Sequence, residues 1–226
     1  LDRSSAASDV YKRQGGTGVA KASVRIFADS AAGPIKELNG GNLAPPLMDE
    51  EMPGCDIRES FSRLNIPITR LHDVPLENAG MRVVDIPLIF ANFHADANDP
   101  RNYYFDQTDD YIRNCVESGT QVYYRLGTSI EHSRNKYFTD PPSDAGKWID
   151  VVSNVIRHYT EGKWNGYRYD IEYWEIWNEP DLGPKMWTGT LEAFNDFYAT
   201  AARELKKRFP HLKFGGPGHC AFGEEK

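Results

Sequence analysis

The spacing of apolar residues predicts an alternation of helices and strands along the chain. Apolar side chains recur every three or four residues in four segments, which predicts amphipathic helices at about 56–64, 108–118, 143–161 and 190–209. Short apolar or aromatic runs typical of strands lie at 35–39, 66–72, 121–126, 171–177 and 212–216. The order strand, helix, strand predicts parallel strands joined by helical crossovers.

The connections in this pattern differ in length. The segments that lead from a strand to the next helix are long, and three of the four returns from helix to strand are very short. Long loops therefore gather at the carboxyl ends of the strands, where barrels and open α/β sheets both build their sites. The stretch NGGNLAPP after the first strand lacks the GxGxxG pattern, so the sequence does not favour an open dinucleotide-binding sheet and we expect no cofactor.

Polar residues occupy alternate positions of two predicted strands. Arg70 and His72 share one face of 66–72, and Glu175, Trp177 and Glu179 share one face at the end of 171–177. A parallel strand buried on both faces is apolar throughout, so inward polar groups favour a barrel with a solvated upper lumen.

The predicted fold class is α/β, an incomplete TIM (β/α)8 barrel with about five βα units. A closed barrel needs eight units and typically about 250 residues. We expect 15–226 to be the N-terminal part of a barrel domain and 1–14, a polar stretch without an apolar core, to be a non-native or disordered leader. The sequence leaves the true N-terminus open. It also leaves the compartment open, with secretion or the periplasm as alternatives for the intact protein.

Composition removes several classes of function. The 226 residues are 40% apolar, enough for one sizeable core, and the formal charge of −7 argues against a nucleic-acid partner. No run of 18 apolar residues exists, so we predict no membrane span. The three cysteines, Cys55, Cys115 and Cys220, have no metal-ligand spacing and predict no disulfide framework, and we expect Cys115 to be a small buried hydrophobe.

The stretch YWEIWNEPDL carries the clearest chemical signal. It places Asn178 and Glu179 at a strand end, between Trp177 and Pro180. A carboxylic acid there can protonate a leaving-group oxygen, and apolar neighbours favour its protonated form. Asn178 points to the opposite face of the strand unless the turn rotates it. The alternative for Glu179 is a helix cap or a surface ion pair, but the Trp-Asn-Glu-Pro context favours catalysis.

This motif resembles the acid/base motif of clan A glycoside hydrolases. Together YWEIWNEPDL, YYRLGTSIEH, RLHD and ELNGGN look like glycoside hydrolase family 39, the β-xylosidase and α-iduronidase group, over Ile35 to Gly218. The resemblance implies a (β/α)8 barrel, a carbohydrate substrate and Glu179 as general acid/base. It also implies that Asn178 contacts the sugar 2-hydroxyl, that His72 lies in the sugar pocket and that Arg70 lies near the nucleophile.

A second carboxylate is required for the reaction. It lies about 5–5.5 Å from the acid in retaining enzymes and about 6.5–9.5 Å away in inverting ones. The family places its nucleophilic glutamate on the seventh strand, beyond this sequence. Glu175 is about 13 Å back along an extended strand, and we expect Asp181 to face solvent. The sequence thus predicts an N-terminal fragment, inactive alone, of a retaining O-glycosidase. The alternatives are a noncatalytic carbohydrate-binding relative and a metal-dependent hydrolase.

The remaining polar and aromatic candidates have simpler explanations. Asp96, Asn98 and Asp99 predict an Asx-rich turn, since the full acidic-loop spacing of a metal site is lacking. We expect Arg125 to pair with an inward carboxylate such as Glu175.

Four more residues complete the candidate set. Glu131 and His132, at the pocket rim, either contact substrate or fix a loop. Trp187 either stacks on a sugar or packs under its loop, and His158 is expected to be structural.

Overall fold

The computed structural model describes residues 37–42, 57–72, 83–129 and 135–221, with isolated residues between 23 and 34. Contacts divide the chain into two units, 1–36 and 37–226. The described residues of the first unit are all exposed. The predicted leader 1–14 lies outside the described residues. Every helix and strand that the described residues form belongs to the second unit.

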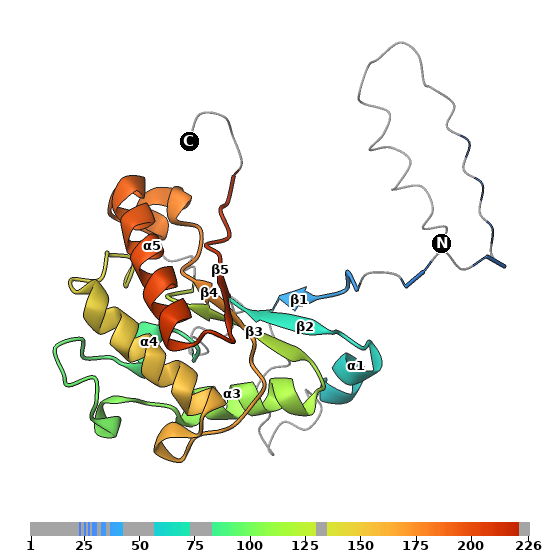
Figure 1. Cartoon of the computed structure of the whole chain (residues 1–226), viewed down its shortest axis with the longest axis horizontal. Helices are drawn as coiled ribbons and strands as arrows, with labels where there is room; N and C mark the ends of the chain where they lie inside the picture. Colours follow the sequence, from blue (N-terminus) through green and yellow to red (C-terminus); the bar gives the residue numbers. More distant parts are fainter. Residues whose placement is uncertain are drawn as a thin grey trace, which may run out of the picture. The chain divides into compact units, whose positions relative to one another are not determined.

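One parallel sheet organises the second unit (Figure 1). Its strands are β1 (Gly41–Asn42), β2 (Ile68–Leu71), β3 (Gln121–Leu126), β4 (Tyr173–Ile176) and β5 (Lys213–Gly215). Neighbouring strands pair in the order β1-β2-β3-β4-β5, and every pair is parallel. The prediction of parallel strands is confirmed, although the first strand forms after the predicted run 35–39 rather than within it.

Helices follow the strands as the apolar spacing predicted. The helices are α1 (Arg58–Arg63), α2 (Ile86–Ile89), α3 (Asp106–Glu117), α4 (Ala145–Thr160) and α5 (Leu191–Arg208). Short 3-10 turns lie in the connections, at η3 (Pro100–Asn102), η4 (Lys163–Asn165) and η5 (Pro180–Lys185). The side chain of Thr190 caps α5 by accepting from the N–H of Ala193, and the side chain of Asp144 caps α4 by accepting from the N–H of Lys147.

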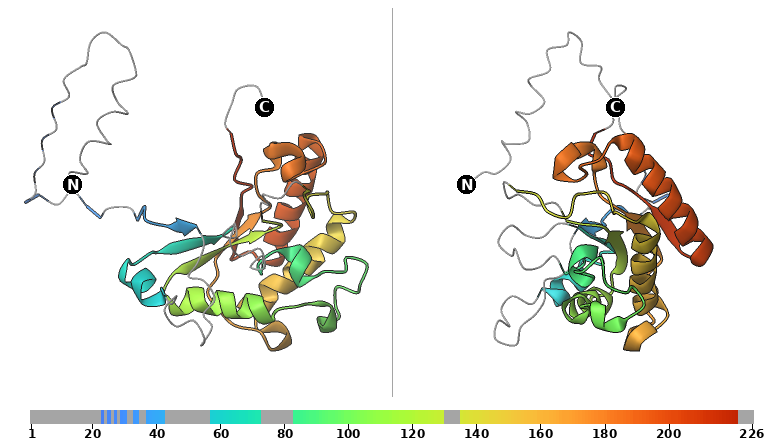
Figure 2. Two further views of the ribbon diagram at one scale, coloured as in Figure 1. Left: turned by 180° about the vertical axis from the view of Figure 1, so that it is seen from behind. Right: turned by 90° about the vertical axis from the view of Figure 1, so that its left-hand side faces the viewer.

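The core lies between these helices and one face of the sheet. Figures 1 and 2 show α3, α4 and α5 along the same side of the strands, with α4 and α5 adjacent. The apolar strand side chains that are almost fully buried there are Leu71, Val122, Tyr124, Leu126, Trp174 and Ile176. Cys115 of α3 is also buried, as predicted, whereas α1 has no buried residue.

The opposite face of the sheet carries the alternate residues of each strand, and many of these are polar. Arg70 of β2, Arg125 of β3 and Glu175 of β4 lie on this face, with Tyr123 and Tyr173 nearer the start of their strands. The two-residue period of a strand separates this polar face from the apolar one. Within the described residues, the five strands form an open sheet with β1 and β5 at its edges.

His158 links α4 to α3 in the core. Its Nε2 atom lies 3.0 Å from Asp109 Oδ1, and its ring stacks on Phe105 with the ring centroids 3.7 Å apart. These contacts satisfy a buried imidazole, so the prediction of a structural role is confirmed.

Candidate active site

Strand β4 ends in a turn with two left-handed residues. Trp177 has φ of 69° and Glu179 has φ of 41°, a backbone region that is uncommon for residues other than glycine. The Trp177 indole donates to the carbonyl of Met186 at 2.8 Å and packs against Trp187 and Phe197. Trp177 therefore turns toward the helices, and the prediction that it shares a face with Glu175 and Glu179 is wrong. The left-handed residue interrupts the alternation of the strand.

The same turn brings Asn178 to the polar face. Asn178 is 2% exposed, and its Oδ1 accepts a hydrogen bond from Arg70 Nη2 at 2.6 Å. Its Nδ2 donates to Glu179 Oε2 at 3.2 Å. Arg70 Nε donates to Glu175 Oε2 at 2.6 Å. A continuous chain of hydrogen bonds thus runs from Glu175 on β4 through Arg70 on β2 to Asn178 and Glu179. Glu179 itself is half-buried.

The segment after β5 packs against this chain. The N–H of Glu179 donates to the carbonyl of Pro217 at 2.8 Å. Gly216 has φ of 105°, and a Cβ atom placed on it would lie 2.7 Å from Glu175 Cγ. A Cβ on Gly218 would lie 3.0 Å from Glu175 Oε1. Only glycine permits such close approach at Gly216. The pair of glycines around Pro217 was a visible turn signal, but its contact with Glu179 was not predicted.

Asp181 fastens the same segment to η5. Its carboxylate accepts from the N–H groups of Cys220, at 3.0 Å, and Ala221, at 3.1 Å, and lies 3.4 Å from His219 Nδ1. Burial alone would raise the pKa of Asp181. The two backbone hydrogen bonds, together with weaker effects, outweigh burial and hold the pKa below its ordinary value. The side chain is 3% exposed. The prediction that Asp181 faces solvent is wrong because it serves as an anchor for the backbone.

His72 and Arg125 form a second polar group beside β4. His72, at the end of β2, is 4% exposed, and its Nδ1 accepts from Arg125 Nε at 3.2 Å. Arg125 Nη2 donates to Asp85 Oδ1 at 2.5 Å and to Ser129 Oγ at 2.9 Å. All four side chains are less than 5% exposed.

Arg125 pairs with a buried carboxylate, as predicted, but the partner is Asp85 rather than Glu175. Glu175 is taken by Arg70, which reaches it across β3, while Arg125 turns toward Asp85. Asp85 lies at the start of α2, inside a connection that the sequence marked only as a long loop. The role of Asp85 as the partner of Arg125 was not predicted. No local sequence pattern indicates it, because the contact joins the loop after β2 to strand β3.

Packing explains the role of Trp187, and turn geometry explains the roles of Asp96 and Asp99. Trp187 is 1% exposed within the aromatic cluster of Trp177, Phe194 and Phe197, so it packs under its loop. Asp96 and Asp99 accept from backbone N–H groups two residues ahead, as predicted for Asx turns.

The described part of the chain contains no group of three or more metal-ligating side chains placed to hold an ion. It also contains no helix with the length and apolar composition needed to cross a bilayer. Glu131 and His132 lie outside the described residues.

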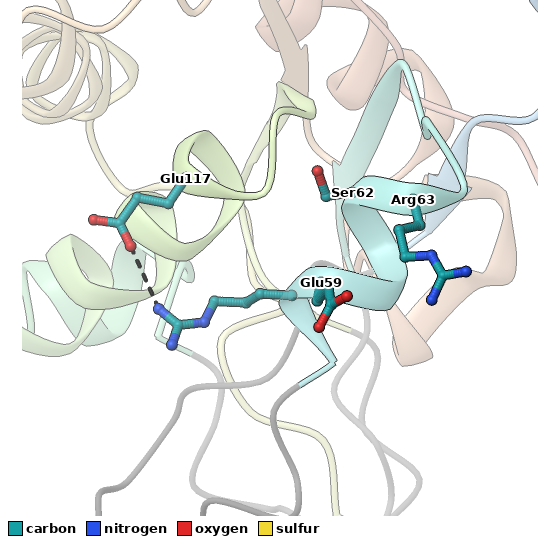
Figure 3. Close-up of a pocket in the computed structure, with 5 residues that line it drawn as sticks. Glu59, Ser62, Arg63 and Glu117 are labelled. Carbon is teal, nitrogen blue, oxygen red and sulfur yellow. Dashed lines mark hydrogen bonds and ion pairs between the residues drawn. The ribbon is translucent and has the colours of Figure 1, made fainter.

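Two pockets lie away from Glu179. One, of about 600 Å³, is lined by residues of α1 and the end of α3, where Arg58 Nη1 pairs with Glu117 Oε2 at 3.4 Å (Figure 3). The other, of about 340 Å³, lies on the helix side of Trp177 and is lined largely by phenylalanine, proline and tryptophan side chains.

Comparisons of the sequence with a family model and with known proteins agree with one another. The model of the family "Glycosyl hydrolases family 39" matches residues 68–223, which include all four predicted site residues. The chain is 34% identical over 90 residues to a β-xylosidase of Geobacillus stearothermophilus, covering 38% of this chain and 17% of that protein. It is 30% identical over 125 residues to an α-L-iduronidase of Canis lupus familiaris, covering 52% of this chain and 18% of that one.

Solved structures give the same picture. A glucosidase from Croceicoccus marinus superposes with a TM-score of 0.64 and 28% identity, over 80% of this chain and 37% of that chain. The chain therefore spans well under half the length of each of these three proteins. Together with the five consecutive parallel strands, these likenesses establish the predicted fold, part of a TIM barrel.

Proposed function

This chain belongs to glycosyl hydrolase family 39, and we propose that it supplies the proton donor of a retaining O-glycosidase, with Glu179 as general acid/base. The observation that carries the proposal is the position of Glu179. It lies at the carboxyl end of β4, half-buried, with Asn178 turned to the same side and hydrogen-bonded to it. That edge is where TIM-barrel enzymes place their catalytic groups.

In the first step, a nucleophilic carboxylate bonds to the anomeric carbon while the bond from that carbon to the glycosidic oxygen breaks, and the Glu179 carboxylic acid gives its proton to that oxygen. In the second step, the resulting carboxylate takes a proton from the water that attacks the glycosyl intermediate. One group performs both transfers because the second step is the reverse of the first with water in place of the leaving alcohol.

Asn178 binds the substrate in this proposal. A side-chain amide has two N–H donors, and in the structure one points to Glu179 Oε2. The second is available for the 2-hydroxyl of the sugar. Arg70 fixes this orientation, because its guanidinium donates to Oδ1 and so turns the NH₂ group toward Glu179. His72 supplies a further polar contact from the end of β2.

The nucleophilic carboxylate, we propose, lies outside these 226 residues. Glu175 is 2% exposed and engaged by Arg70, and glycines of the segment after β5 cover it. Asp181 is occupied by two backbone N–H groups. Neither carboxylate is free to attack an anomeric carbon. The chain alone is therefore expected to show no hydrolysis, and Glu179-dependent hydrolysis of aryl glycosides by the 226 residues would overturn this placement.

The test of Glu179 uses the enzyme that contains this chain and compares two classes of aryl glycoside. Glu179→Gln is expected to lower kcat/KM by about 10²–10⁴-fold when the leaving phenolate is strongly basic. The loss should be far smaller when the phenolate is a weak base, because its departure needs no proton. Glu192→Gln, an exposed change on α5, should alter neither value. Equal losses for both classes would contradict a proton donor, and sugar binding without any turnover would favour the noncatalytic relative.

A further inference from the structure

We propose that Arg125, anchored by Asp85, is a positioning residue that holds His72 in a single tautomer, neutral and with its proton on Nε2. In this form the imidazole carries its N–H donor on Nε2. Any link between this tautomer and sugar binding rests on the proposed function, whereas the tautomer itself concerns the chain alone and is tested separately.

The tautomer follows from the atoms in contact. A guanidinium group has five N–H donors and no acceptor. His72 Nδ1 lies 3.2 Å from Arg125 Nε, so this ring nitrogen must present its lone pair. A neutral imidazole has one donor and one acceptor, and the proton must then lie on Nε2. A doubly protonated ring would set two N–H groups against each other beside a permanent positive charge.

The guanidinium cannot turn away to relieve such a clash. Its Nη2 is held by Asp85 Oδ1 and by Ser129 Oγ. Asp85 is itself fixed, because its second oxygen accepts from the N–H of Ser129 at 2.8 Å and from Thr128 Oγ1 at 3.3 Å. Arg125 is fully buried and Asp85 is 1% exposed. The contact with His72 is therefore imposed by a rigid frame on β3 and its following loop.

Stability alone is a weak reason for this arrangement. Replacing a buried ion pair with apolar residues of similar volume is often neutral or stabilising. Arg125 carries an additional cost, since its Nη1 is buried without a hydrogen-bond partner. Arg125 instead provides a fixed hydrogen-bond donor. This donor sets the tautomer of His72, at the edge of the sheet that also carries Glu179.

The test measures the tautomer directly on the 226-residue chain. Histidine labelled with ¹⁵N is observed by long-range ¹H–¹⁵N correlation NMR, and His72→Gln assigns the signals by their loss. We expect wild-type His72 to show an unprotonated Nδ1 and a protonated Nε2. A proton on Nδ1, or a doubly protonated ring at neutral pH, would overturn the proposal without touching the role of Glu179.

Variants separate positioning from mere packing. Arg125→Met removes the donor, and the double change Asp85→Asn with Arg125→Met also removes the carboxylate that would otherwise be left buried and unpaired. Either is expected to give a mixture of tautomers at His72. Ser129→Ala removes a different hydrogen bond of the same guanidinium and should leave the tautomer unchanged. A single Nε2–H tautomer that persists in a folded double variant would show that Arg125 does not set it.

Discussion

The backbone N–H of Glu179 donates a hydrogen bond to the carbonyl oxygen of Pro217, 2.8 Å away. This contact ties the candidate proton donor on β4 to the segment that follows β5. The same segment lies against Glu175 through Gly216 and Gly218. The position of Glu179 therefore depends on a loop remote in sequence, and changes in that loop should reach the site.

Gly216→Ala tests this dependence. The added Cβ would lie 2.7 Å from Glu175 Cγ and 3.1 Å from the Ile176 carbonyl oxygen, at a backbone φ of 105°. We expect a loss of about 1–3 kcal/mol in the free energy of unfolding, measured by urea denaturation, and faster hydrogen exchange at the Glu179 amide. Gly215→Ala is the matched control, because a Cβ there meets nothing within 4 Å. Equal effects of the two changes would contradict the close-approach argument.

Asp181→Asn tests the anchor of the same segment. An asparagine at this site keeps one acceptor oxygen but sets its NH₂ group against a backbone N–H, so hydrogen exchange at Cys220 and Ala221 should quicken. Asp170→Asn, at an exposed position, is the control. Unchanged exchange at both amides would show that the carboxylate is not what holds them.

The same anchor should depend on pH. The pKa of Asp181 is lowered in the folded chain, so its contribution to stability is fully present above the unfolded value of about 3.9. It is lost as pH falls through the lower folded pKa. Hydrogen exchange at Cys220 measured toward acid pH should show this loss in the wild-type chain and not in Asp181→Asn.

Arg70→Met should destabilise the chain strongly. It leaves the Glu175 carboxylate, 3% exposed, without its ion-pair partner. Removing one member of a buried pair typically costs 3–5 kcal/mol, and we expect about 3 kcal/mol because Arg70 is 23% exposed. Denaturant unfolding gives the value. Arg58→Met removes the exposed pair with Glu117 and should cost about 0–1 kcal/mol; similar losses for the two arginines would refute the distinction.

Trp187→Ala tests whether this ring serves packing. It is 1% exposed among three other aromatic rings, so its removal should cost about 3–5 kcal/mol. Tyr137→Ala, at a side chain that is 59% exposed, should change stability by about 0.5 kcal/mol or less. Thermal or urea unfolding of the two variants decides. A small effect at Trp187 would reopen the alternative that it stacks on a sugar.

The sequence by itself determined the order of elements, the parallel sheet and the edge at which Glu179 lies. Periodicity is a local property, and four of the five strands form inside the predicted runs. Parallel strands that alternate with helices must end at one edge, so the carboxyl ends of β2 and β4, with His72 and Glu179, had to lie on the same side of the molecule. The polar alternation also placed Arg70 and Glu175 correctly on one face.

Only the tertiary structure decided which groups meet. The left-handed backbone at Trp177 moved Asn178 to the polar face, and strand periodicity cannot foresee such a break. The sequence did not determine which carboxylate each long arginine side chain meets, and the packing of distant segments assigned Glu175 to Arg70 and Asp85 to Arg125. Within a regular strand, spacing along the chain fixes the face that a side chain occupies, whereas its partner depends on how distant segments pack.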